Sequence, residues 1–448
     1  MSALFDRSGL QEPRLLGTRW QARIVGTIVL VLAVASTAVA QRFQSIEPKL
    51  NVREANAMRG TVTKALRDPS AFEANKKDLD AYFTKYYFPT MTLPAKLGEL
   101  AKRRENLFKQ FIRPARVPAA QQHLTALTLK AMGIIARGNF HPAVRYNAVL
   151  ILGMLDEKVA GSGAGGAKPV PFPAGTNELL DLLENDEFKN VKVPASLKLG
   201  ALLGLERHAR FGINPQYADR VTKAALAMIA QEEPPADLDP EVHYWMRCQA
   251  ARVLSRQFAE GPNAQVQAAI TSLIADPHMS IEDRCSATEL MKRMKYDAAA
   301  GVDVTATVRA MGDLAKTVAS DEAEKANDFQ DEMLRGGGGR RLQGGEELTY
   351  QRRRLVARLH SIYEGGNSLS KGLPDAERQQ LQSLLSTLEP VMEVADDKDS
   401  GDLDITPKVI EMAKQVRSVV ESWKPADKAP AGEATEKKPA EEAEIDLS

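Results

Sequence analysis

The sequence predicts an all-α protein in which an α-solenoid of paired helices lies between N-terminal and C-terminal helical segments. Alanine and leucine dominate the composition, and aromatic residues make up only 6% of the chain, which favours helix packing over β-sandwich or barrel cores. Apolar residues recur at helical spacing, and one helical pattern returns several times along the chain. Such recurrence is typical of stacked repeats, in which each unit buries its apolar face against the next.

The first expected region, residues 1–40, carries arginines ahead of an apolar run that ends in Ala38, Val39 and Ala40. A basic segment, an apolar run and a small-residue cleavage site are typical of an export signal. Because the run is close to the roughly 17 to 20 residues that cross a bilayer, an uncleaved membrane anchor is the alternative. Both interpretations place the body outside the cytoplasm, in the periplasm or on the inner membrane of a bacterial-type cell.

The N-terminal helical segment is expected at residues 41–117. Its helices are predicted at 52–66, 71–88 and 94–112, with proline-containing turns between them. The middle helix ends in an aromatic cluster made of Tyr82, Phe83, Tyr86, Tyr87 and Phe88. A binding surface is one interpretation of this cluster. The helical spacing of its rings favours the other, a seam against a neighbouring helix.

The pattern that recurs is clearest in residues 141–157. Pro142 lies where the first turn of a helix tolerates proline, and Val144, Ala148, Ile151 and Leu155 follow at helical spacing with one apolar face. This stretch is therefore predicted to be an amphipathic helix.

Four such helices align on a basic residue followed three positions later by alanine. The pairs are Arg145 and Ala148, Lys198 and Ala201, Arg247 and Ala250, and Arg284 and Ala287. Each is preceded by a predicted first helix, at residues 121–137, 177–184, 217–231 and 263–275. A small residue at the shared position permits close approach of stacked helices. Residues 118–297 are therefore predicted to form the solenoid.

The best-defined unit resembles the second helix of a HEAT repeat. The residues that carry the resemblance are Pro142, Val144, Arg145, Ala148, Leu152, Gly153 and Leu155. HEAT-repeat proteins are curved α-solenoids that present an inner surface to other macromolecules, and some related bacterial sets assist chromophore attachment. The resemblance thus implies a binding scaffold, and it carries over no catalytic residue.

Two groups of basic residues are candidates for binding a partner. The first is the aligned set Arg145, Lys198, Arg247 and Arg284, on the second helices. The second group is Arg340 and Arg341 in the Gly/Arg-rich loop 335–345, and further arginines follow at 352–358. Together these arginines could hold a phosphate, a carboxylate polymer or an acidic partner. The alternative for this second group is a connector beside a helix face that the acidic stretch 321–332 neutralises.

The two cysteines, Cys248 and Cys285, each follow an aligned arginine and so occupy equivalent positions in adjacent units. An exported protein can form disulfides. Equivalent positions in stacked helices are, however, about 8 to 10 Å apart, beyond the ~7 Å Cα limit of a bridge. We therefore predict two buried free thiols.

The remaining segments complete the expected organisation. The glycine- and proline-rich stretch 161–175 is predicted to be a loop between the first and second units, and it lacks the Gly-Lys-Ser/Thr ending of a phosphate cradle. In the C-terminal region, 298–423, helices are expected at 304–325, 346–364, 374–394 and 407–423. Residues 424–448 are rich in Lys, Pro, Ala and Glu, and we expect a disordered tail.

Charge and motifs narrow the function. Lys plus Arg equals Asp plus Glu at 59 each, so no attraction of the whole chain to nucleic acid is expected. The sequence contains no GxSxG, HExxH, GxxxxGK[ST] or CxxCH motif, and we expect neither cofactor nor metal. The predicted function is a non-catalytic scaffold of the cell envelope that binds a protein partner. The alternatives are a structural spacer that tethers membrane to wall and an accessory lyase-type enzyme of the HEAT-repeat kind.

Overall fold

The computed structural model describes residues 43–161, 166–297, 302, 304–336 and 349–423. Within these ranges the chain is all-α, as predicted, and its strands form two short hairpins. The expected export signal, the centre of the Gly/Arg-rich loop and the C-terminal tail lie outside the described residues. No helix within the described ranges is long and apolar enough to cross a membrane.

The first helices run nearly where the sequence places them. They are α2 (Val52–Ala65), α3 (Pro69–Tyr82), the π-helical turn η1 (Phe83–Tyr87) and α4 (Phe88–Thr90). Asn51 caps α2 in a reciprocal capping box with Glu54, and Asp68 accepts a hydrogen bond from the Ser70 amide at the start of α3. The predicted second helix continues to Thr90, two residues beyond its predicted end at Phe88.

The aromatic cluster is part of the core. Tyr82, Phe83, Tyr87 and Phe88 are buried, and three of these rings surround Phe111 with centroid distances of 5.2 to 5.8 Å. The predicted seam is thus confirmed. Phe111 comes from the third predicted helix, which is composed of η2 (Pro94–Glu99), α5 (Leu100–Asn106) and η3 (Leu107–Ile112).

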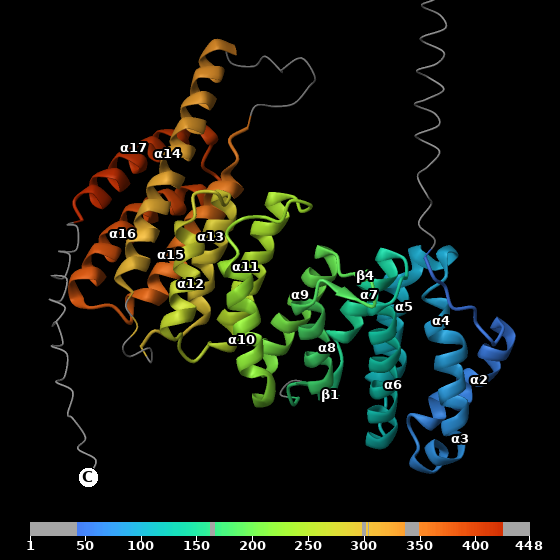
Figure 1. Ribbon diagram of the computed structural model, residues 1–448. Helices are drawn as coiled ribbons and strands as arrows, with labels where there is room; N and C mark the ends of the chain where they lie inside the picture. Colours follow the sequence, from blue (N-terminus) through green and yellow to red (C-terminus); the bar gives the residue numbers. More distant parts are fainter. Residues whose placement is uncertain (1–42, 162–165, 298–301, 303, 337–348, 424–448) are drawn as a thin grey trace, which may run out of the picture.

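The middle of the chain forms four helical pairs. They are α6 (Pro118–Arg137) with α7 (Pro142–Leu152), α8 (Pro173–Glu184) with α9 (Ala195–Phe211), α10 (Pro215–Ala230) with α11 (Pro240–Gln257), and α12 (Ala264–Ala275) with α13 (Ile281–Glu289) and the short η4 (Leu290–Arg293). The second helices contact one another in chain order, α7 with α9, α9 with α11 and α11 with α13, and Figure 1 shows the pairs in a row.

Two short hairpins lie next to the helices of the second pair. Strands β1 (Asp156–Lys158) and β2 (Val170–Pro171) flank the loop between the first and second pairs, and β3 (Glu187–Phe188) with β4 (Val191–Lys192) joins α8 to α9. The loop was expected to extend to Gly175, but α8 begins at Pro173. Proline is favoured at the first position of a helix, which accounts for the earlier start.

Four longer helices follow the pairs: α14 (Thr305–Gly336), α15 (Arg352–Ser370), α16 (Asp375–Asp396) and α17 (Asp402–Glu421). Contacts of α12 with α14 and of α13 with α15 continue the packing, so this group joins the end of the row (Figure 1). The last helix starts five residues before the predicted Pro407, because the Gly401 amide donates to Asp404 Oδ2 at 2.9 Å and caps it earlier.

Small residues set the spacing of the second helices. The aligned alanines Ala148, Ala201, Ala250 and Ala287 are all buried. At the end of α7, a Cβ on Gly153 would lie 2.6 Å from the Cα of Gly204 in α9. The two backbones are therefore too close for any side chain between them, which explains the glycine that ends the HEAT-like pattern.

We predict that Gly153→Ala lowers the free energy of unfolding by about 1 to 3 kcal/mol, because its methyl group forces α7 and α9 apart. Urea denaturation measures the change. Gly60→Ala is the matched control, since no atom lies within 4 Å of its Cβ position in α2, and it is expected to stabilise by about 0.5 to 1 kcal/mol. Equal effects of the two substitutions would contradict the close contact.

Candidate functional site

The aligned arginines lie inside the helical pairs. Each donates a hydrogen bond from Nε to a carbonyl in the last turn of the first helix of its own pair: Arg145 to Ala136 at 2.9 Å, Arg247 to Ile229 at 3.0 Å, and Arg284 to Ile274 at 2.8 Å. In every case the acceptor is the next-to-last residue of that first helix. All three arginines are buried, and Arg247 is only 1% exposed.

This bond has a simple physical basis. The last four carbonyls of a helix have no partner within the helix, and that end carries partial negative charge, so a guanidinium there is favourable. Lys198, the aligned residue of the second pair, instead places Nζ 2.6 Å from Asp186 Oδ1, just after α8. Arg247 adds a bond from Nη1 to Asp276 Oδ2 of the following pair at 2.6 Å. The aligned cations therefore connect each second helix to its surroundings within the chain.

We predict that Arg247→Met lowers the free energy of unfolding by about 2 to 4 kcal/mol, because it leaves the Ile229 carbonyl and the Asp276 carboxylate without their donor. Urea denaturation is again the measurement. Arg309→Met, which changes an exposed arginine of α14, is the control and should shift stability by less than about 0.5 kcal/mol. A small effect at both positions would show that the buried bond contributes little.

Both cysteines are free and buried, as predicted. The Cys248 thiol lies 3.6 Å from the Asp283 carbonyl of the next second helix. Burial raises the pKa of both thiols to about 12. At neutral pH they therefore remain protonated and unreactive.

We expect native protein at pH 8 to react very slowly with iodoacetamide, because both thiols are shielded and protonated. Denatured, unreduced protein should label at two sites by mass spectrometry. The same sample reduced before labelling is the control and should give the same count. Finding no reactive thiol before reduction would mean that the cysteines are oxidised.

Arg340 and Arg341 lie outside the described residues, but the arginines that follow them are visible. Arg354 and Arg358 contact the fully buried Glu322 at 2.8 and 2.7 Å, and Arg358 also reaches Glu282 of α13. The acidic stretch thus neutralises these two arginines, which tie the C-terminal helices to the fourth pair. Arg352 donates to the Ala395 carbonyl at the end of α16 and to the Ser400 carbonyl in the turn that follows.

A second set of arginines occupies equivalent places on successive second helices. Arg207, Arg256 and Arg293 each come nine residues after the aligned cation of their unit. Sequence reasoning missed this set, although extending the alignment by nine positions would have found it. The three residues lie near the ends of α9, α11 and η4, which pack in that order.

Their surroundings differ. Arg207 Nη2 lies 2.8 Å from both carboxylate oxygens of Asp156. Arg256 Nε and Arg293 Nη1 lie 3.8 and 3.7 Å from one shared oxygen, Glu206 Oε1, which is too far for a hydrogen bond. Both nitrogens are shielded from solvent and have no acceptor among the residues that the structure describes, and the same holds for Nε of Arg252, one turn earlier on α11.

We call Arg252, Arg256 and Arg293 the arginine cluster. Burial is the largest influence on Arg293 and lowers its pKa, and the positive charges of Arg256 and Arg252 lower it further. Like charges are thus held together in a half-buried place. Such an arrangement favours an anion, because an anion would relieve the repulsion and accept the unused N–H groups.

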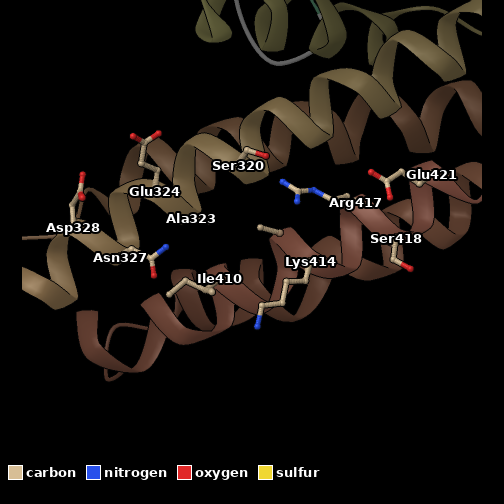
Figure 2. Close-up of a pocket in the computed structure, with 11 residues that line it drawn as sticks. Ser320, Ala323, Glu324, Asn327, Asp328, Ile410, Lys414, Arg417, Ser418 and Glu421 are labelled. Atoms are coloured by element: carbon tan, nitrogen blue, oxygen red, sulfur yellow. The ribbon is translucent and has the colours of Figure 1, made fainter.

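Two hollows lie elsewhere on the surface. A groove of about 630 Å³ lies between α14 and α17, and its lining includes Glu324 and Asp328 of one helix and Lys414 and Arg417 of the other (Figure 2). A second hollow of about 860 Å³ lies between the ends of the second and third pairs, and its lining includes Lys198 and His243. In the described ranges no three His, Cys, Asp or Glu side chains are grouped to hold a metal.

No protein-family model, no curated protein and no solved structure matches this chain. The class of the protein therefore comes from the fold itself. It is an all-α chain whose central region is a row of helical pairs, and the arginine cluster lies on the second helices of that row.

Proposed function

We propose that this chain is a HEAT-type α-solenoid that acts as a non-catalytic scaffold and binds a protein partner along its second helices. The observation that carries the proposal is the unbroken contact of α7, α9, α11 and α13 in chain order. Stacked helices of this kind provide a long, continuous surface, which suits a macromolecule better than a small molecule.

The side chains of α11 support a protein as the partner. Trp245, Arg252 and Arg256 are spaced seven and four residues apart and so lie along one helix face. Trp245 is 39% exposed, although an indole is costly to leave in water. Tryptophan and arginine are the residue types that most often dominate the energy of protein interfaces.

The proposal includes the location of the protein. The basic and apolar segment 1–40 supports export, with the body in the periplasm or anchored on the outer side of the inner membrane. A scaffold in the envelope would meet its partner there.

Affinity capture from an envelope extract, followed by chemical cross-linking, tests the function. We expect one partner at constant stoichiometry, and we expect Trp245→Ala to lower its recovery about tenfold. Leu403→Ala, which removes an exposed side chain of α17, is the matched control and should leave recovery unchanged.

The contrary outcome is equally specific. Equal recovery of the partner with Trp245→Ala and with Leu403→Ala would contradict binding at the surface of the second helices. Loss of envelope association on deleting residues 424–448, with no partner captured by the full chain, would favour a structural spacer instead.

A further inference from the structure

Within the second arginine set, Arg207 has a carboxylate partner, whereas Arg256 and Arg293 have none at hydrogen-bond distance. Asp156 follows the aligned Arg145 of the first unit by eleven residues, and it holds Arg207 of the second unit through both carboxylate oxygens. The equivalent residues before Arg256 and Arg293 are Ala209 and Phe258, neither of which has a carboxylate. The same arginine position thus recurs without its acidic partner.

Glu206 does not replace the missing carboxylates. It presents one oxygen to two guanidinium groups at 3.7 and 3.8 Å, and it forms no hydrogen bond with either. Two further carboxylates lie within electrostatic reach of the cluster, and both have other donors. Glu289 is hydrogen-bonded by Lys292, whose contact is the largest influence lowering the pKa of that carboxyl, and Asp283 accepts a hydrogen bond from the Ser280 hydroxyl. Three guanidinium groups therefore share an incomplete set of counterions.

Elsewhere in the chain, half-buried arginines find acceptors. Arg103, Arg137, Arg220 and Arg354 each donate to a carboxylate at 3.1 Å or less. Shielded guanidinium nitrogens without an acceptor also occur at Arg137 Nε and Arg145 Nη2, but each of those arginines donates to another acceptor through a different nitrogen. In the arginine cluster such nitrogens occur at three neighbouring positions. A shielded N–H donor without an acceptor destabilises the folded protein by about 1 to 3 kcal/mol. A ligand that supplies the acceptor would remove this penalty, and the gain would favour its binding.

We propose that Arg252, Arg256 and Arg293 bind an aspartate or glutamate side chain in an acidic segment of the protein partner. The proposal rests on the scaffold function, since the partner supplies the carboxylate. Guanidinium groups form strong, charge-assisted hydrogen bonds with carboxylates. The Arg207 and Asp156 pair is an example within this fold, in which one guanidinium nitrogen contacts both carboxylate oxygens.

A carboxylate suits the site better than a nucleic-acid backbone. The equivalent arginine of the second unit, Arg207, already binds a carboxylate through both of its oxygens.

The test measures binding of a fluorescent, end-capped hexaglutamate peptide to the full chain, with hexaglutamine as the uncharged comparison. We expect saturable binding of hexaglutamate that the double variant Arg256→Gln/Arg293→Gln weakens at least about tenfold. Arg309→Gln removes one exposed positive charge that is not part of the cluster and should change the affinity less than about twofold.

Glu206→Gln provides a test that does not depend on the stability of the arginine variants. Removing the internal carboxylate should tighten hexaglutamate binding several-fold, because the peptide no longer competes with it. Unchanged or weaker binding in Glu206→Gln, or equal binding by the double variant and the wild type, would overturn the proposal. Tighter binding of a single-stranded oligonucleotide than of hexaglutamate would also overturn it in favour of nucleic acid.

The outcomes separate this proposal from the scaffold function. A captured partner whose recovery is unaffected by the double variant would leave the scaffold standing and remove the carboxylate site. Cluster-dependent binding of hexaglutamate without any captured partner would keep the site and remove the scaffold.

Discussion

A hydrogen bond from a second-helix arginine to the last turn of the first helix recurs in three of the four pairs, through Arg145, Arg247 and Arg284. It satisfies a carbonyl that the first helix leaves open and places a positive charge at the negative end of that helix. Because the bond joins the same two positions each time, it fixes how these three second helices lie on their partners. The second helices contact one another in chain order, and the arginines nine positions after the aligned cations lie near the ends of successive second helices.

Packing between pairs completes this arrangement. Alanines at the shared position are buried, and Gly153 lies against Gly204 where α7 meets α9. Further along the row, α9 packs on α11 and α11 packs on η4, and Arg207, Arg256 and Arg293 lie near the ends of these three helices. The packing of the row therefore also gathers positive charge on it. Arg358 of α15, which contacts both Glu322 of α14 and Glu282 of α13, connects the C-terminal helices to the row.

Much of the fold follows from local patterns, whereas the site does not. Prolines at first-turn positions, such as Pro142 and Pro240, and apolar spacing place the helices and their pairs nearly correctly. The aligned cations were expected on a binding surface because charged side chains usually face water. In the structure these arginines donate to backbone carbonyls. Every residue has a carbonyl, so the sequence does not show which one accepts the bond, and the buried position of Arg247 could not be deduced from it. The arginine cluster exists because the positions equivalent to Asp156 are occupied by Ala209 and Phe258, which have no carboxylate. The importance of those two positions is evident only from the structure, in which Asp156 binds Arg207.

The central claim, that the helices form pairs stacked in chain order, is open to one direct measurement. Carbodiimide joins a lysine to a carboxylate only where the two are in contact, and mass spectrometry identifies the linked peptides. The structure predicts a link between Lys198 and Asp186 within the second pair, and one between Lys295, just after the fourth pair, and Glu260, just after the third. Recovering both links from native, monomeric protein would agree with the stack. Their absence, together with links between the first and fourth pairs, would contradict it.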